Sequence, residues 1–560
     1  MPHVLTKHYS GPVRADDGPP AVARCEGNPL ILHATCLTLA MLGLTAQAAD
    51  TVVVCPKVFH SAMRPWFEHR CRQGHKIELV DAQGSPERIR ADIRRVAKGG
   101  ALRFVVLVGD TQPARGNDQG VRARTVPTHF ALAKVNIRFG SGPDIATDNW
   151  YADLDDDRVP DVAIGRLSAD SPQEVTALVA KILAYERAAG DDVWRRRINL
   201  VAGLGGFGSL ADTALEAGAK SILTEGIPPA YATSLTHAGW RSPYCPVPAN
   251  FGETTVDRLN DGCWFWVYIG HGQTRELDRV PVPGGQYHIL GAGDVGKLRA
   301  ARGAPIVLFL ACYTGAYDLV EDCLAEEMLR AQGGPVAVLC GSRVTMPYAM
   351  SVLGMGLLKE CFHERRETIG EVLLYAKRNM VFAPRDDERS RQLDALAATL
   401  NPDSTDLAEE RLEHLDLFNL LSDPLLRLRH PREAVVEAVS PVAAGERLKV
   451  HGMSPLDGEA LVELVVRRDR LTFRPPGRVE FSDSPESAAE FQATYEKAND
   501  PRLASRRVKV EHGRYETELE VPEGAWGECH VRVFVQGRAE CATGAADVTV
   551  RRAIRSAKKP

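Results

Sequence analysis

This chain of 560 residues lacks a large excess of either charge. It has 68 Lys and Arg residues and 73 Asp and Glu residues, for a net charge of −5. Such a balance gives no support to nucleic-acid binding, and the short basic tail over residues 553–560 is expected to be solvated. Long apolar runs are equally scarce. The stretch from Leu30 to Leu44 is too short for a membrane span, and no other segment approaches one. Cysteine and histidine nowhere take the spacing of a zinc site.

The 12 cysteines are too few for a disulfide framework in a chain of this length. One pair is nevertheless suggestive, because Cys529 and Cys541 flank an apolar strand and a glycine-containing turn. A hairpin could join them as a disulfide in an oxidising compartment. Two unpaired strand cysteines explain the pattern equally well.

Residues 1–48 have the features of an N-terminal extension and an export signal. The apolar stretch is followed by Ala46-Gln47-Ala48, which fits a small-residue cleavage site. The 29 residues before Leu30 are long for the start of a signal, so a later start of translation is an alternative. We expect a secreted, periplasmic or cell-surface protein.

From residue 49 onward short apolar strands alternate with helices, which predicts an α/β fold with parallel sheets. A polar, glycine-rich stretch from Gly140 to Asp148 divides an α/β subdomain at 49–145 from a catalytic α/β subdomain at 146–432. Beyond 432 the period-2 alternation of short strands is typical of an immunoglobulin-like β-sandwich, at 433–552. The polar stretch Arg467–Ser505 inside it is expected to be a mobile insertion.

Two dyads stand at the ends of strand-like runs. Gly270-His271-Gly272 follows the apolar run 263–269, and Ala311-Cys312 follows the run 306–310. Runs so short and so rich in β-branched and aromatic residues predict buried parallel strands. Open α/β sheets carry their chemistry at the carboxyl ends of such strands. A histidine and a cysteine in these places predict a hydrolase with a cysteine nucleophile.

This chemistry requires more than the two side chains. A thiol is a weak nucleophile until an imidazole assists it, and the attacked carbonyl needs fixed donors where its oxygen becomes negative. Gly272 permits close approach of the substrate, so its N–H and that of Cys312 could form an oxyanion hole. A cysteine after an apolar run is more often a small buried hydrophobe. The other His-Gly pairs, at His451 and His512, follow no comparable strand.

The sequence resembles the gingipain family of cysteine peptidases, relatives of caspases and legumains with His-Gly and Ala-Cys at strand ends. The likeness spans roughly residues 50–430 and includes Asp161-Val-Ala-Ile-Gly-Arg166, Ala184-Tyr-Glu186, Cys323-Leu-Ala-Glu326, Arg330-Ala-Gln332 and Asn419-Leu-Leu-Ser-Asp-Pro424. The resemblance implies a caspase-like fold and an endopeptidase that acts on polypeptides and requires no cofactor. Cys312 would attack the peptide carbonyl and His271 would protonate the leaving amine.

The resemblance also implies a third catalytic residue. An imidazole usually needs an acceptor that orients it, and the gingipain pattern has an acidic residue just before the strand that ends at Arg166. In this chain that residue is Asp161. A simple turn that enters the strand accounts for the same aspartate.

An acidic loop precedes this strand and contains Asp153, Asp155 and Asp157, whose oxygens are of the kind that calcium accepts. A structural calcium ion is thus the one metal that the sequence suggests. Arg158 stands where an EF-hand needs glycine, and no glutamate closes the loop at its twelfth position. The resembling family often has a cleaner Asp-Gly-Asp-Gly pattern here, so a solvated acidic loop stays open as the alternative.

Substrate preference is the least determined feature. By resemblance to gingipains that cut after Arg or Lys, Glu174 or Asp170 could place a carboxylate in the substrate pocket. The stretch Ser171-Pro-Gln-Glu174 is also a well-formed capping box, which is a structural explanation for the glutamate. Thr345 and Met346 match the wall of the family's pocket, where this chain has no tryptophan.

Two other classes of function remain open, and the sequence carries no signal for the oligomeric state. A catalytically idle caspase-like scaffold could display the β-domain for adhesion or assembly. A nucleotide-binding oxidoreductase would use Gly203-Leu-Gly-Gly-Phe-Gly208, which matches the dinucleotide fingerprint with Glu225 some 20 residues on. That glutamate lies in a turn rather than at a strand end, which favours a structural turn. The resembling peptidases carry a long prodomain, whereas here a strand begins almost at the expected cleavage site.

Overall fold

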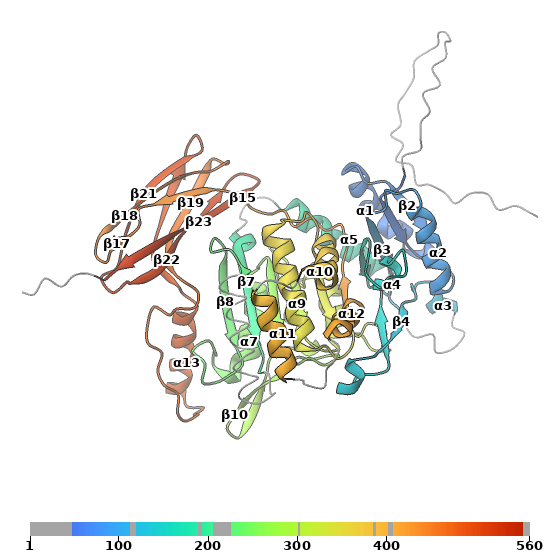
Figure 1. Cartoon of the computed structure of the whole chain (residues 1–560), viewed down its shortest axis with the longest axis horizontal. Coiled ribbons are helices and arrows are strands. Elements are labelled where there is room, and N and C mark those ends of the chain that lie inside the picture. Colours follow the sequence, from blue (N-terminus) through green and yellow to red (C-terminus); the bar gives the residue numbers. More distant parts are fainter. Residues whose placement is uncertain are drawn as a thin grey trace, which may run out of the picture.

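The computed structural model describes residues 48–111, 119–188, 193–204, 226–300, 303–384, 388–400 and 407–552. Figure 1 shows a broad α/β body, coloured blue to yellow, and a β-domain in red beside it. The predicted signal, all but the start of the Gly203–Gly208 turn, and the basic tail lie outside the described residues. Within the described ranges, no helix combines the length and the apolar character that a membrane crossing requires.

One ten-stranded sheet forms the centre of the α/β body, and its neighbouring strands are parallel except for the antiparallel pair β13 and β14. Six of its inner strands are buried at every residue, as expected for a sheet covered on both faces. The spatial order is β2 (Ile77–Val80), β1 (Thr51–Val54), β3 (Phe104–Val108), β6 (Ala163–Leu167), β14 (Phe418–Leu421), β13 (Ala337–Gly341), β12 (Ile306–Leu310), β9 (Phe265–Ile269), β7 (Arg197–Ala202) and β8 (Ala232–His237).

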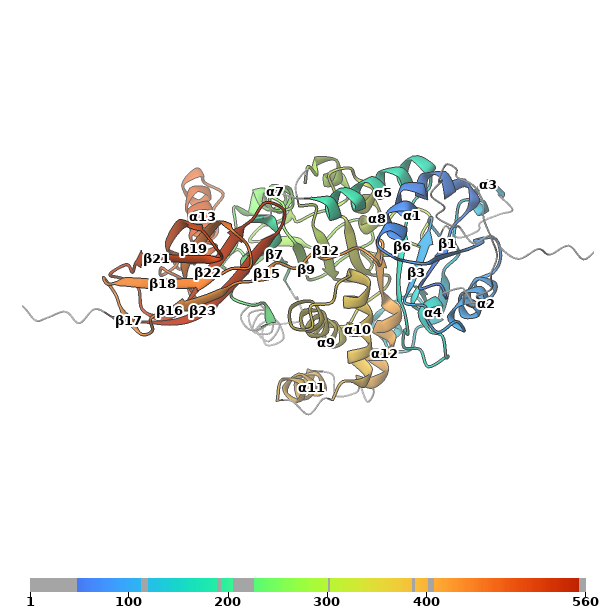
Figure 2. The same cartoon turned by 90° about the horizontal axis from the view of Figure 1, so that it is seen from above.

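Helices cover both faces of this sheet. Seen from above in Figure 2, α1, α5 and α8 lie on one side and α9, α10 and α12 on the other. The main helices are α1 (His60–Arg72), α2 (Pro86–Ala97), α5 (Pro172–Arg187), α7 (Phe251–Asn260), α8 (Leu324–Arg330), α9 (Pro347–Leu358), α10 (Ile369–Phe382), α11 (Glu388–Leu400) and α12 (Leu407–Leu417). Two hairpins extend from the body, β4 (His129–Leu132) with β5 (Asp144–Thr147) and β10 (Arg279–Val282) with β11 (Gly285–His288).

The sheet runs on across position 146, where the sequence divides the α/β body. β6 pairs with β3 on one side and, through Arg166 and Leu421, with β14 on the other. The fully buried Arg166 guanidinium donates to both oxygens of Asp148 at 2.7 Å. It also donates to two backbone carbonyls. A buried charge is tolerated only when it is paired in this way, so the junction is a rigid part of the core.

The predicted C-terminal β-domain is confirmed, and it has a hydrophobic core of its own. Strands β18 and β21 alternate between buried and exposed residues, as expected for a sheet with one solvated face. One sheet contains β15 (Arg432–Glu433), β23 (Cys541–Arg551), β22 (Gly527–Gln536), β19 (Gly458–Val466) and β20 (Arg502–Val510), with β17 (Val442–Ala443) beside β23. The other contains β16 (Val435–Ala438), β18 (Arg447–Met453) and β21 (Arg514–Glu520).

The prediction of a mobile insertion over Arg467–Ser505 is wrong. The segment contains helix α13 (Pro485–Ala498) and the start of β20, and it docks on the edge strand β8 of the large sheet. Asn499 exchanges two hydrogen bonds with the Leu235 backbone, and the hydroxyls of Tyr495 and Thr236 lie 2.9 Å apart. The polar composition of the segment concealed these anchors. Through them, the insertion joins the β-domain to the α/β body.

The proposed Cys529–Cys541 disulfide is also wrong. In the β22–β23 hairpin Cys529 faces Val548, whereas Cys541 faces Gln536 close to the turn. The two thiols therefore lie near opposite ends of the hairpin, far beyond the roughly 4.4–6.8 Å between Cα atoms that a disulfide spans. Neither cysteine forms a disulfide, and both are buried. The spacing in sequence was compatible with a bridge, but the short turn sets a register that separates the pair.

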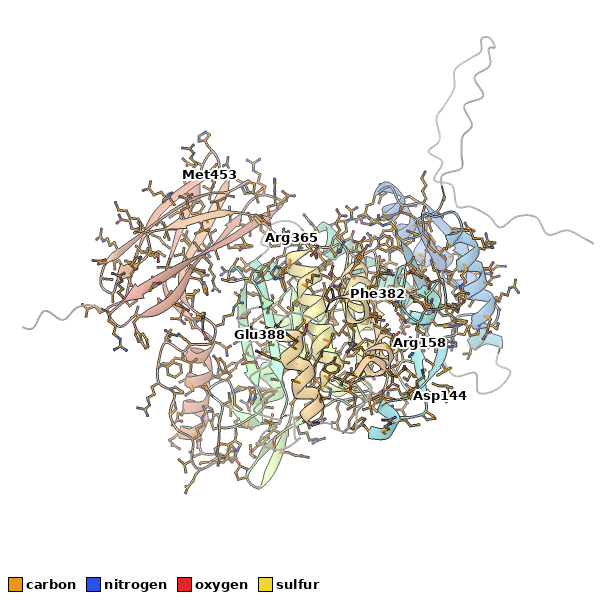
Figure 3. All side chains as sticks on the ribbon, in the orientation of Figure 1. Asp144, Arg158, Arg365, Phe382, Glu388 and Met453 are labelled. Atoms are coloured by element: carbon orange, nitrogen blue, oxygen red, sulfur yellow. The ribbon has the colours of Figure 1, made fainter. Side chains whose placement is uncertain are left out.

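His430 lies at the junction between the two bodies, near Arg365, which Figure 3 labels between the α/β body and the β-domain. The His430 ring stacks edge-on against Trp264, and its Nε2 hydrogen-bonds the Arg366 carbonyl at 2.7 Å. Arg365 in turn donates to the Pro431 carbonyl. Burial lowers the pKa of His430 to about 4. The junction therefore contains an uncharged imidazole at neutral pH.

We expect this histidine to make the protein sensitive to acid. An unfolded chain protonates the imidazole near its ordinary pKa of about 6.5. The neutral, buried His430 ring therefore makes its full contribution to the free energy of unfolding above about pH 6.5. This contribution is lost as the pH falls through the folded pKa near 4. The free energy of unfolding should fall over this range, and should fall less in His430→Phe. Urea titrations at pH 7 and pH 4.5 measure both proteins, and equal pH dependence would contradict the expectation.

Candidate active site

The two predicted catalytic residues follow neighbouring parallel strands. β9 and β12 pair in register, with Ile269 opposite Leu310, so His271 and Cys312 each stand two residues beyond this pair. The Gly270 N–H still reaches the Leu310 carbonyl, at 3.3 Å. His271 is exposed and Cys312 is half-buried. The prediction that His271 and Cys312 follow neighbouring parallel strands is confirmed. That their side chains face one cleft and form a catalytic dyad stays a prediction.

Gly272 packs directly against the nucleophile's backbone. A Cβ atom added there would lie 2.6 Å from the Cys312 carbonyl oxygen and 3.0 Å from the Ala311 Cβ. Such distances leave no room for a side chain. The carbonyl of His271 is held by the Tyr268 hydroxyl at 2.8 Å and the Asp278 N–H at 3.1 Å. The loop after β9 is thereby fixed against the loop after β12.

The backbone N–H of Gly272 is directed away from the short hairpin that it begins. Gly272 stands opposite Leu277 in an antiparallel pair, flanked by the hydrogen bonds from Asp278 to His271 and from Gln273 to Glu276. In a pair flanked in this way, the two opposed residues direct their own N–H groups outward. The Gly272 N–H therefore makes no hydrogen bond to Leu277, and its part in an oxyanion hole stays a prediction.

The Cys312 sulfur receives a hydrogen bond from the chain that follows β13. The Thr345 N–H donates to Sγ at 3.3 Å, and the Thr345 hydroxyl oxygen lies 3.6 Å from the same sulfur. The sulfur also lies 3.7 Å from the Thr345 carbonyl oxygen, to which the thiol can donate. The next residue after the nucleophile, Tyr313, has a φ of 56°, an uncommon conformation for a residue with a side chain. The Thr314 N–H closes this turn on the Cys312 carbonyl at 2.7 Å.

Helix α8 connects the loop after β9 with the loop after β12. At its N-terminus Leu324 donates to the Thr274 carbonyl and Ala325 donates to the Thr314 carbonyl. The Glu326 carboxylate accepts from the Cys323 N–H and the Ser168 hydroxyl. Burial and the neighbouring Asp110 raise the pKa of Glu326 to about 8. The helix therefore holds both loops with N–H groups that would otherwise lack an acceptor.

An open cavity of about 700 Å³ adjoins the loop after His271. Residues 273–276 form one side and the 3₁₀ turn Ala292–Lys297 with His288 forms the other. The ring nitrogen of His288 lies 2.5 Å from the Asp294 carboxylate. The lining of this cavity is polar and includes neither His271 nor Cys312.

Asp161 is placed in the acidic loop. Its carboxylate accepts from the Leu154 N–H at 2.9 Å and from Arg378 at 3.3 Å. Asp153, Asp155 and Asp161 could bring one oxygen each within 4.8 Å of one another. Both oxygens of Asp153 already accept backbone N–H bonds, and Arg90 pairs with it at 3.1 Å. This geometry suits a loop satisfied by the protein itself, and calcium binding stays a prediction.

The two acidic candidates for the substrate pocket are engaged within the protein. Glu174 caps helix α5: its carboxylate accepts from the Asp170 N–H at 2.7 Å, and its own N–H donates to Ser171. Asp170 forms an ion pair with Arg330 at 2.9 Å. The capping box is thus present, and a preference for basic side chains remains a prediction of the resemblance. Thr345 contacts the Cys312 sulfur and Met346 follows it, and their place in the wall of a substrate pocket stays a prediction.

Sequence reasoning missed the groups that position the site. His414, from α12, accepts a hydrogen bond from the Met346 N–H, and Arg343 forms a buried ion pair with Asp318 beneath the same segment. The backbone carbonyl of Arg343 also accepts a hydrogen bond from the Tyr313 N–H. Nothing local to these residues signals a role, since each acts through a partner distant in the sequence.

The sheet and the site define an α/β protein with a cysteine and a histidine at the ends of adjacent parallel strands. A family model described as "Peptidase family C25" matches residues 44–429. The chain therefore belongs to peptidase family C25. The expected caspase-like fold is confirmed by solved structures. The crystal structure of the Arg-specific cysteine proteinase gingipain R (RgpB) matches 90% of this chain and 98% of its own, with a TM-score of 0.51 and 17% identity.

Related proteins match this chain at low sequence identity. Gingipain R2 of Porphyromonas gingivalis is 24% identical over 329 residues, which are 56% of this chain and 39% of the relative. Lys-gingipain W83 of the same species is 27% identical over 293 residues, which are 50% of this chain and 15% of the relative. The chain thus matches less than two fifths of the length of these relatives. The complex of RgpB pro- and mature domains matches 90% of this chain and 100% of its own, with a TM-score of 0.50 and 18% identity.

Proposed function

We propose that this protein is a cysteine endopeptidase that hydrolyses peptide bonds with Cys312 as nucleophile and His271 as general acid and base. The carrying observation is the register of β9 and β12, which sets both residues at the same distance beyond one pair of neighbouring strands. Membership of the C25 family supports the same chemistry. The oxidoreductase alternative has no comparable support.

In the first step the Cys312 sulfur attacks the carbonyl carbon of the substrate and its proton passes to His271. The carbon becomes tetrahedral and its oxygen becomes negative. The outward N–H of Gly272 and the N–H of Cys312 are the donors we assign to this oxygen. The Thr345 N–H donates to this sulfur at 3.3 Å, and the role we assign to it is to orient the sulfur.

In the second step His271 gives the proton to the leaving amine, and the carbon–nitrogen bond breaks to leave a thioester. A water molecule that His271 deprotonates then attacks the thioester carbon and releases the acid product and the thiol. The exposure of His271 suits it to both tasks, since amine and water reach it from solvent. The polar cavity next to residues 273–276 is the space we assign to the leaving part of the substrate.

The catalytic unit we propose is the dyad, with Asp161 as a separate hypothesis. An orienting role for Asp161 predicts that Asp161→Asn lowers the turnover number and leaves thermal stability close to that of the wild type. A role confined to the acidic loop predicts the reverse, because both carboxylate oxygens accept hydrogen bonds there. Export from the cell and binding of calcium are likewise proposals that rest on the sequence.

A peptide-library screen with wild type and Cys312→Ala tests the proposed function. We expect the wild type to cleave a subset of peptides and to be labelled at Cys312 by a thiol probe, and Cys312→Ala to do neither. Cys71→Ala is a matched control, since Cys71 is the other half-buried cysteine among the described residues. An idle scaffold would show no cleavage in any of the three proteins, and this result would overturn the proposal.

A further inference from the structure

We propose that His414 is a positioning residue for Cys312: it holds the Thr345–Met346 segment so that the Thr345 N–H points at the nucleophilic sulfur. The inference rests on the proposed function. It is carried by a chain of hydrogen bonds that leads from helix α12 to the reacting atom.

The imidazole of His414 is used at both nitrogens. Nε2 accepts from the Met346 N–H at 2.8 Å, and Nδ1 lies 2.7 Å from the Glu410 carbonyl oxygen. A carbonyl can only accept, so Nδ1 carries the proton and Nε2 carries the lone pair. One tautomer therefore satisfies both partners. The ring links a turn of α12 to the segment after β13.

His414 is completely buried, and this burial keeps the ring neutral. The pKa of His414 is lowered to about 4 because a charged ring would be desolvated there. A protonated ring could not accept from Met346. The acceptor is consequently present throughout the pH range in which a peptidase with a cysteine and a histidine would work.

The amide that His414 holds is adjacent to the amide that contacts the sulfur. Thr345 donates to Cys312 Sγ at 3.3 Å, and Met346 donates to His414. Because the peptide unit between them is planar, a shift of the Met346 N–H also moves Thr345. Loss of the acceptor would leave a buried N–H without a partner, and the segment would have to move to satisfy it.

Other residues of α12 hold the chain around this segment. The Glu410 carboxylate accepts from the Ala349 N–H, and the Glu413 carboxylate accepts the N–H groups of residues 134–136. Asn136 in turn donates to the Val344 carbonyl. These contacts keep the surroundings in place when the ring alone is changed. The effect of His414 on the sulfur can therefore be measured separately.

The experiment compares the rate of Cys312 alkylation by iodoacetamide, as a function of pH, in wild type, His414→Phe and His414→Gln. In His414→Phe we expect the profile to shift by about one pH unit to higher pH, as for loss of one hydrogen bond to a charged group. The rate at neutral pH should fall about tenfold. In His414→Gln the side-chain oxygen can accept from Met346, and the profile should return toward that of the wild type. With a cleaved peptide, the loss should appear in kcat more than in KM.

His430→Phe is the matched control. His430 is also a buried histidine whose pKa is lowered to about 4, but it contacts Trp264, which precedes β9 at the end of the strand opposite to His271. It should lose stability without a shift of the alkylation profile. If His414→Phe does not fold, His414→Asn replaces it, because the asparagine amide is too short to reach Met346.

An unshifted profile in folded His414→Phe or His414→Asn would overturn the inference. So would failure of His414→Gln to restore the profile. These outcomes differ from failure of the proposed function, in which wild-type Cys312 would be alkylated no faster than Cys71 and no peptide would be cleaved.

Discussion

Replacing His271 with alanine is expected to lower the turnover number for a cleaved peptide by about a thousandfold, within the range for loss of a general acid and base. The proton of the Cys312 thiol would lose its acceptor, and the amine would have to leave without a proton. The structure sets His271 at the strand end next to Cys312, with its backbone carbonyl held by Tyr268 and Asp278. The measurement is steady-state kinetics on the best peptide from the library.

His451→Ala is the control, because His451 also precedes a glycine but lies exposed in the β-domain, paired with Glu437. It should keep full turnover. A folded His271→Ala protein with turnover within tenfold of the wild type would show that another group moves the proton, and the dyad would have to be abandoned.

Replacing Gly272 with alanine should lower turnover by about a hundredfold, as for loss of one preorganised donor. The smallest side chain would place its Cβ 2.6 Å from the Cys312 carbonyl oxygen, far inside normal contact. The loop after β9 must then move away from the nucleophile, and the Gly272 N–H moves with it. Rates of single-turnover cleavage measure the loss at the chemical step.

Gly285→Ala is the matched control, since a Cβ there meets no atom within 4 Å and the residue lies in the neighbouring β10–β11 hairpin. Its turnover should be that of the wild type. The melting temperature of each variant separates a displaced donor from an unfolded protein. Turnover equal to that of the wild type in a folded Gly272→Ala variant would remove Gly272 from the oxyanion hole.

The catalytic pair could be predicted because its signal is local. A short, continuous apolar run is readable without knowing its neighbours. β12 is such a run and is buried throughout, and β9 is buried except at the half-buried Val267 and Ile269. The residues that follow them must lie at the edge of the sheet. His271 and Cys312 were therefore recognisable from their positions alone, and the small residues beside them agreed with close backbone packing.

Elsewhere the same local reading failed or stayed ambiguous. The spacing of Cys529 and Cys541 permits a disulfide, but register depends on the turn and on both partner strands. The stretch that contains α13 is polar enough to suggest a mobile loop, yet Tyr495 and Asn499 anchor it to β8. For Glu174 two local readings competed, and the structure shows the helix cap.

The sequence by itself determined the alternation of strands and helices, the change to a β-domain near residue 432, and the two strand ends that carry His271 and Cys312. Only the tertiary structure decided that β9 and β12 are neighbours in register and that Gly272 lies against Cys312. It also decided that Thr345 donates to the sulfur and that His414 accepts from Met346. The physical reason is the distance along the sequence over which each property is set. Burial and periodicity are properties of a few consecutive residues, whereas a hydrogen bond between Met346 and His414 joins groups 68 positions apart and exists only once the core has packed.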